Sequence, residues 1–280
     1  MVRVPEQPAS SPLPSAGRRL KQWLAWGVHA YTALGLVLAA GIAVLVVRGG
    51  ADSFRWAFVL MVLATLIDAT DGILARAVRV KEVLPGFDGR RLDDIIDFLN
   101  YTALPLLLVW RAGILPEGQD AWLLAPLVAS AYGFCQVAAK TADGYLLGFP
   151  SYWNLVVFYL YVLHFHVVPL PGWFSVGVLV GLALLTFLPT RYLYPSQGSK
   201  LRGLTNLLGA VWAAMVVCIL YCLPADGGSA AAGDGGLLRA LILLSLFFPI
   251  YYMVASWAIS WTLWRRQKRE SRRRPSEQER

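Results

Sequence analysis

The chain has 280 residues, of which 57% are hydrophobic and only 15% charged, and its mean hydropathy is +0.55. So apolar a composition excludes a single soluble domain of this length and indicates a protein that crosses a membrane several times. The net charge of +8 has no soluble basic domain to carry it, so we expect no nucleic-acid partner.

The apolar stretches are long, rich in Leu, Ala, Val and Gly, and lack the alternation of β-strands, which favours helices over a barrel. We therefore predict an all-α fold, a polytopic helical membrane protein with about eight transmembrane helices. Each predicted span is near the roughly 17–25 residues that a bilayer requires. The spans are residues 25–47, 54–76, 93–112, 122–141, 151–170, 173–189, 204–223 and 238–264.

The sequence divides into three parts around these spans. Residues 1–20 are rich in Pro and Ser and are predicted to be disordered or interfacial, without a cleaved signal peptide. Residues 21–264 form the predicted transmembrane domain, and residues 265–280 a basic cytoplasmic tail. The three cysteines lie within spans without metal-site spacing, so we interpret them as packing residues.

The distribution of basic residues predicts the orientation. If the N-terminus is cytoplasmic, only four of the 25 Lys and Arg residues fall on the outer side, namely Arg48, Arg55, Arg111 and Arg239. Cytoplasmic loops of membrane proteins carry such an excess of basic residues. With an even number of spans, both termini are then cytoplasmic, and the inner ends of the second and third spans face the cytoplasm.

Four aspartates occur at those inner ends. Asp68 and Asp71 share one face of the second span, and Asp93 and Asp97 share one face of the third. A carboxylate near the bilayer costs several kcal/mol unless it is paired, hydrated or bound to a cation. Divalent cations prefer oxygen ligands. Two such cations about 3.5–4 Å apart can stabilise both the attacking and the leaving oxygen when a phosphoryl group is transferred. The pattern therefore predicts a divalent-cation site for phosphoryl chemistry.

Two other hypotheses explain the same aspartates. The aspartates could form salt bridges with Arg76, Arg90 and Arg91, or they could line a cation-transport site. A transport site is usually nearer the middle of the membrane, whereas this cluster lies at one end. Gly72 and Ala75 remove bulk beside the aspartates, so a large phosphorylated ligand could approach the helix backbone.

The two helices match the pattern D-x-x-D-G-x-x-A-R followed by G-x-x-x-D-x-x-x-D, so the chain resembles the CDP-alcohol phosphotransferase family. The matching positions are Asp68, Asp71, Gly72, Ala75, Arg76, Gly89, Asp93 and Asp97. Twelve residues separate Arg76 from Gly89, more than is usual in that family. This longer gap, together with segments 138–154 and 191–196, resembles the bacterial branch that makes phosphatidylcholine.

The resemblance implies roles for the matching residues. Asp68, Asp71 and Asp93 would hold two divalent cations, Mn²⁺ or Mg²⁺, and Asp97 would be the general base and contact a metal as well. The remaining positions would contact the CDP-diacylglycerol. These are Gly72, Ala75, Arg76 and Gly89.

The implied reaction joins choline to CDP-diacylglycerol and gives phosphatidylcholine and CMP. Serine, inositol and glycerol 3-phosphate remain open as other alcohol acceptors. The resemblance also implies a multi-pass protein of the bacterial inner membrane, in contact with membrane lipids, with its active site on the cytoplasmic side, and it suggests a homodimer.

Choline carries a quaternary ammonium group, which aromatic rings and a nearby carboxylate can bind. Tyr101, Tyr152 and Trp153 are candidates by position, against the alternative that they pack or lie at the interface. Further candidates are Tyr132, Tyr145 and Tyr194.

Two basic residues and three histidines complete the candidates. Lys140 and Arg191 lie at cytoplasmic span ends, where they would bind a lipid phosphate or anchor the topology. The histidines lie in spans without carboxylates at ligand spacing, so we interpret them as packing or interfacial residues. They are His29, His164 and His166.

Overall fold

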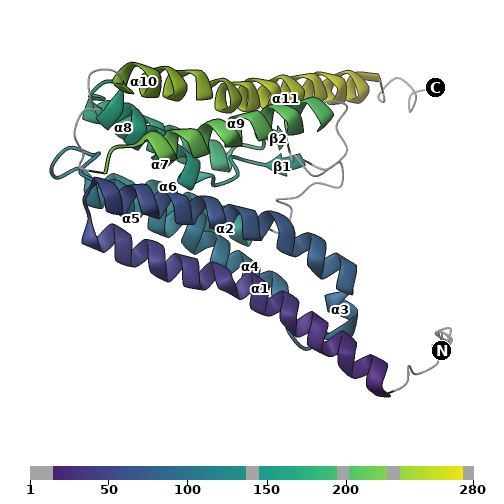
Figure 1. The fold of residues 1–280 in the computed structure, drawn as a ribbon. Coiled ribbons are helices and arrows are strands. Elements are labelled where there is room, and N and C mark those ends of the chain that lie inside the picture. The colour runs from purple at the N-terminus through teal and green to yellow at the C-terminus, as the bar shows by residue number, and fades with distance from the viewer. Residues whose placement is uncertain (1–14, 137–144, 194–201, 226–233, 274–280) are drawn as a thin grey trace.

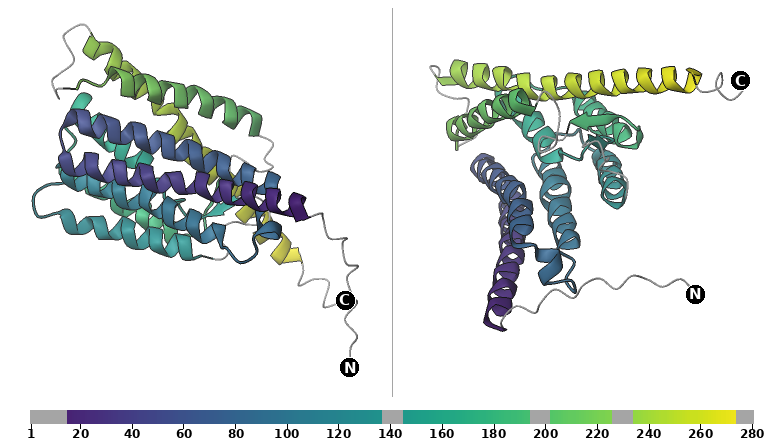
Figure 2. Two further views of the ribbon diagram at one scale, coloured as in Figure 1. Left: turned by 60° about the horizontal axis from the view of Figure 1, so that its bottom comes forward. Right: turned by 90° about the vertical axis from the view of Figure 1, so that its right-hand side faces the viewer.

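The structure of the chain is a computed structural model, and it describes residues 15–136, 145–193, 202–225 and 234–273. Two long helices, α1 (Ser15–Arg48) and α2 (Ala51–Val78), pack side by side along one side of the molecule (Figure 1). On the opposite side, α10 (Asp234–Ser245) and α11 (Phe247–Arg273) follow one another across the fold. The right-hand view of Figure 2 shows this separation of α1 from α11.

The remaining elements are shorter than α1 and α2, and they contain most of the buried apolar core. In chain order they are α3 (Val80–Val83), α4 (Gly89–Asp97), the π-helix η1 (Phe98–Ala103), α5 (Leu104–Arg111), the 3₁₀-helix η2 (Asp120–Leu123), α6 (Leu124–Cys135), α7 (Trp153–His166), α8 (Gly172–Phe187) and α9 (Arg202–Cys222). Strands β1 (Tyr145–Leu147) and β2 (Arg191–Leu193) lie between α6 and α7 and between α8 and α9 along the chain.

The prediction of a helical membrane protein is confirmed. Four stretches of the described chain are helical, long and apolar enough to cross a membrane, and they are Gly17–Arg48, Ala51–Val78, Gly203–Cys222 and Gly235–Arg265. Two shorter apolar helical stretches, Asp120–Cys135 and Gly172–Phe187, coincide with further predicted spans. The number of eight crossings stays a prediction, because length and composition identify only the four.

The helices extend past the predicted limits of the transmembrane domain at both ends. α1 begins at Ser15 rather than near residue 25, and α11 continues to Arg273, into the predicted tail. Near that end Arg265 lies 4.8 Å from the Trp261 ring centroid and Lys268 4.9 Å from that of Trp264. Residues 1–14 and 274–280 lie outside the described residues.

The predicted third span is one helical run whose middle is a π-helix. η1 follows directly on α4 and leads into α5, where Pro105 stands in the first turn. Proline lacks the N–H for a bond to the carbonyl four residues earlier, and its ring crowds that carbonyl. A wider π-turn before Pro105 relieves this crowding, and such turns often occur at functional sites.

The described residues include a small antiparallel sheet that the sequence analysis did not predict. β1 pairs with β2, with Tyr145 opposite Leu193 and Leu147 opposite Arg191. The backbone of Arg191 bonds Ser260 of α11 in both directions, with N to Oγ at 2.7 Å and Oγ to carbonyl O at 2.9 Å. Strands of three residues are too short to give a periodic sequence signal, so the tertiary contacts decide their formation.

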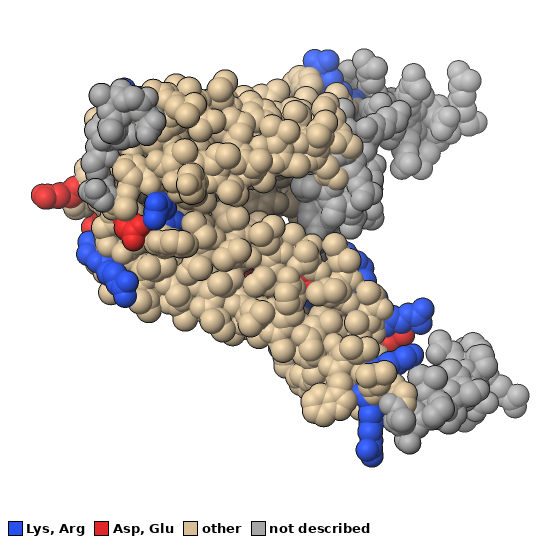
Figure 3. Space-filling model, viewed as in Figure 1, with Lys and Arg blue, Asp and Glu red and all other residues tan. Residues whose placement is uncertain are grey.

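Charged side chains gather at two ends of the molecule, with a wide band of other residues between them (Figure 3). Three of the four arginines predicted for the outer side donate to carbonyls at the C-terminal ends of helices, where carbonyls lack helical partners. The bonds are Arg111 Nε to Val47 O at 3.3 Å, Arg55 Nη1 to Leu223 O at 3.3 Å, and Arg239 Nε to His166 O at 3.2 Å. These arginines therefore have a structural role at that end.

Gly35 lets α1 approach α4 closely. A Cβ at this position would lie 2.5 Å from Cγ2 of Ile96. The Asn100 side chain of η1 also donates to the Gly35 carbonyl at 3.1 Å. The contact of α1 with α4 and η1 therefore depends on the absence of a side chain at Gly35.

We expect Gly35→Ala to destabilise the protein, because Ile96 is buried and β-branched and has few rotamers with which to yield. Overpacking of this kind typically costs about 1–3 kcal/mol. Gly27→Ala, on the same helix, is the matched control because a Cβ there meets nothing within 4 Å. Thermal unfolding in detergent micelles measures both variants, and an equal Tm for the two would contradict the proposed crowding.

Candidate active site

The hairpin between α2 and α4 brings the two acidic pairs together. α2 ends at Val78, and the left-handed backbone of the next residue, Arg79 (φ 56°), turns the chain into α3. α4 then begins at Gly89, capped by Asp88, whose side chain accepts a hydrogen bond from Arg91 N at 3.2 Å. Asp and Asn are favoured at this capping position. The long gap in the sequence motif is thus a short helix and a capped turn that returns the chain along α2.

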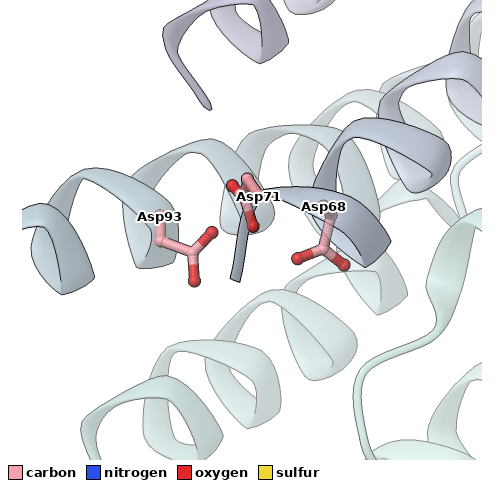
Figure 4. Close-up of side chains that lie close together, drawn as sticks. All are labelled: Asp68, Asp71 and Asp93. Carbon is pink, nitrogen blue, oxygen red and sulfur yellow. The ribbon is translucent and has the colours of Figure 1, made fainter. Parts of the chain in front are cut away.

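Three of the four predicted carboxylates converge. Oxygen atoms of Asp68 and Asp71 on α2 and of Asp93 on α4 all lie within 4.8 Å of one another. Figure 4 shows Asp71 between the other two, with the carboxylates of Asp68 and Asp93 directed inward. Asp97 lines the same small cavity, which has a volume of about 10 Å³. The predicted convergence of the acidic pairs is therefore present in the structure.

Hydroxyl groups from two other helical segments hold the aspartates. Thr32 of α1 donates to Asp71 Oδ2 at 2.8 Å, and this carboxylate is 6% exposed. Tyr101 of η1 donates to Asp68 Oδ2 at 2.7 Å. These bonds fix the orientation of the two carboxylates.

Sequence reasoning missed the contribution of α1 to this site. Thr32, Gly35 and Asn100 line the cavity together with the aspartates. The only local signal for Thr32 is a polar residue in an apolar helix, which does not distinguish a helix-packing contact from a site contact. Thr32 is recognised as a site residue only because α1 packs against α2 and α4 in the structure.

Two of the three arginines that were considered as partners of the aspartates lie beside other acids. Arg90 lies 3.9 Å from Asp94, and Arg91 lies 3.2 Å from Asp88, in both cases with acids outside the cluster. Both of these ion pairs therefore involve acids other than the four aspartates of the motif.

The predicted glycine positions have neighbours that explain their small size. A Cβ at Gly72 would lie 3.3 Å from Nη1 of Arg76, so this guanidinium folds back along α2. A Cβ at Gly89 would overlap the ring of His29. Ala75 packs with the small cluster of α1 residues Ala25 and Val28. Gly89 and Ala75 thus serve close contact of α4 and α2 with α1.

Of the aromatic residues predicted for choline, the structure brings Tyr101 to the aspartates. Trp153 is 0% exposed, its Nε1 donates to Ser130 Oγ at 2.6 Å, and its ring centroid lies 5.3 Å from that of Phe149. Tyr152 packs edge-on with Tyr252 at 6.2 Å. The structure therefore gives Trp153 a place in the core, apart from the residues that line the acidic cavity.

The other predicted binding residues are not brought to the cavity. Arg191 lies in β2, Tyr145 lies in β1, and Tyr132 packs 4.8 Å from Phe187. Lys140 and Tyr194 lie outside the described residues.

No family model matches this chain. It is 37% identical over 204 residues to a phosphatidylcholine synthase of Pseudomonas aeruginosa, covering 72% of this chain and 82% of the relative. It is also 33% identical over 242 residues to a phosphatidylcholine synthase of Legionella pneumophila, covering 81% of this chain and 89% of the relative. A third, from Bradyrhizobium diazoefficiens, is 36% identical over 204 residues, covering 72% of each chain. The chain therefore belongs to the phosphatidylcholine synthase family.

Proposed function

We propose that this protein transfers the phosphatidyl group of CDP-diacylglycerol to choline and releases phosphatidylcholine and CMP. The observation that carries the proposal is the assembly of the motif aspartates between α2 and α4, in a chain whose relatives are phosphatidylcholine synthases. A cation transporter would need no such motif, and other alcohol acceptors would place the protein outside the activity named for its relatives.

The acidic cluster fits divalent cations. Its donor set consists of carboxylate oxygens from Asp68, Asp71 and Asp93, which are the ligands that Mg²⁺ and Mn²⁺ prefer. Three or four carboxylates in so small a space repel one another unless cations offset their charge. We propose that these aspartates, with Asp97, hold two such ions. When bound, the ions would offset charge on the diphosphate and on the leaving CMP.

The chain's own residues then have separate tasks. The choline oxygen attacks the phosphorus that bears the diacylglycerol, the phosphorus–oxygen bond to CMP breaks, and Asp97 accepts the choline hydroxyl proton. Tyr101 holds Asp68 and lines the cavity together with Asp97, and we propose that its ring also faces the choline ammonium. Arg76 and the small residues of the motif would face the nucleotide.

The remaining choline and lipid contacts stay predictions. Tyr152 and Trp153 begin α7, which contacts η1, but Trp153 would reach a ligand only by giving up its bond to Ser130. Lys140 and Arg191 remain predicted contacts for a lipid phosphate.

We further propose eight crossings of the bacterial inner membrane, with both termini and the aspartates on the cytoplasmic side, in a homodimer. This arrangement leaves the acyl chains of the substrate in the bilayer while choline and CMP exchange with the cytoplasm. The uneven distribution of basic residues supports it.

The first experiment is an assay of the purified protein in detergent micelles with CDP-diacylglycerol, labelled choline and Mn²⁺ or Mg²⁺. We expect labelled phosphatidylcholine and CMP, both lost on addition of a chelator. CMP release with serine, inositol or glycerol 3-phosphate but not with choline would overturn the proposal that choline is the acceptor. Failure to release CMP with any acceptor would overturn the activity.

Asp97→Asn should lower kcat by at least about 100-fold, because general-base catalysis typically contributes a factor of 10²–10⁴. Binding of CDP-diacylglycerol should be largely retained. Asp94→Asn is the matched control on the same helix, since Asp94 lies beside Arg90 outside the cluster. Turnover by Asp97→Asn at the rate of the control would remove the general-base role.

Thr32→Val should weaken Mn²⁺ binding by about 10–100-fold, because groups that orient a metal ligand typically contribute this much to affinity. Thr32→Ser keeps the hydroxyl that donates to Asp71 and should retain most of the affinity. Calorimetric titration with Mn²⁺ measures the effect without turnover, and Asp71→Ala gives the reference for loss of the ligand itself. Unchanged Mn²⁺ affinity in Thr32→Val would show that the hydrogen bond does not position Asp71 for metal binding.

A further inference from the structure

An imidazole outside the sequence motif lies buried beside it. His29 of α1 is 7% exposed, and its ring centroid lies 4.4 Å from that of Phe87 and 5.9 Å from that of Trp26. Its edge rests against Gly89, where a side chain would overlap it. Its Nε2 atom is buried without a hydrogen-bond partner among the described residues. Buried polar atoms are almost always partnered, so this nitrogen requires an explanation.

Packing explains the ring but leaves Nε2 unexplained. The contacts with Phe87, Trp26 and Gly89 would be served by an apolar side chain of similar size, without the cost of desolvating a nitrogen. The sequence-based interpretation of His29 as a packing residue is therefore incomplete.

The position of the ring relates it to the acidic cluster. His29 lies one helical turn before Thr32, which holds Asp71, and Gly89 lies one turn before Asp93. The imidazole thus lies one turn from the predicted metal ligands, on the side of the α3–α4 turn. On α2 the same flank of the cluster carries Arg76, whose guanidinium folds over Gly72.

We propose that His29 Nε2 donates a hydrogen bond to a phosphate oxygen of the cytidine nucleotide of CDP-diacylglycerol. The proposal rests on the proposed function, since it assigns a residue to that substrate. A neutral imidazole provides one N–H, and a phosphate held by cations one turn away provides an acceptor within reach. Phe87 lies in the turn between α3 and α4, packs on the His29 ring and is 37% exposed, and the proposal requires that its ring shift to admit the ligand.

The test compares His29→Gln with His29→Asn. A Gln amide reaches the position of Nε2, whereas an Asn amide reaches only that of Nδ1, and both variants lose the ring to a similar degree. His166 on α7 provides the matched control, with the same two substitutions at a ring that lies near Tyr161. The readouts are the Kd for CDP in the presence of Mn²⁺, the KM values for CDP-diacylglycerol and choline, and the Tm, on the full chain in detergent micelles.

We expect His29→Asn to raise the Kd for CDP and the KM for CDP-diacylglycerol by roughly tenfold, as for the loss of one hydrogen bond to a charged group, with the KM for choline unchanged. His29→Gln should restore most of the affinity, and the His166 variants should match the unsubstituted protein. Unchanged CDP affinity in His29→Asn, or equal losses in both His29 variants, would overturn the proposal and leave His29 a packing residue. The CDP titration does not depend on the acceptor, so failure of phosphatidylcholine formation in the unsubstituted protein would be distinguished from failure of this contact.

Discussion

Mutual repulsion of carboxylates in an apolar bundle is the constraint on which the rest of this structure depends. Asp68, Asp71 and Asp93 lie within 4.8 Å of one another, and the helices around them are largely apolar. In such surroundings like charges repel far more strongly than in water. The fold meets this constraint with hydroxyl donors from α1 and η1 and with a donor set suited to divalent cations. The features that hold these helices close therefore also hold the site.

Close helix contact is the second requirement, and small residues supply it. Gly35 admits Ile96 between α1 and α4, and Gly89 admits His29 between the same two helices. Within membranes, where lipid is as apolar as the side chains, such close packing drives helix association. Gly35, which is outside the motif, and Gly89, which is within it, thus allow the close helix contacts on which the geometry of the aspartates depends.

The family assignment and the site geometry support one another. The relatives are named for the synthesis of phosphatidylcholine, and the residues that would carry this chemistry lie together where α2 and α4 meet. Arg90 lies beside Asp94 and Arg91 beside Asp88, and both of these acids lie outside the cluster. In a phosphatidyl transfer at this site, the acyl chains of the lipid would stay in the bilayer, and the charged diphosphate would lie among the helices.

The sequence by itself determined the helical membrane character, the assignment of Asp68 and Asp71 to one helix and of Asp93 and Asp97 to the next, and the family. These follow from local composition, from the helical period and from a motif with fixed spacing, so they need no knowledge of which helices touch. Only the tertiary structure decided that Thr32 and Tyr101 hold the aspartates, that Trp153 lies in the core, and that His29 rests against Gly89. It also decided the pairing of β1 with β2, which no periodic pattern in the sequence predicts. The reason is physical: a helix exposes several faces, and the partner of each face is set by packing against distant segments, which spacing along one chain does not encode.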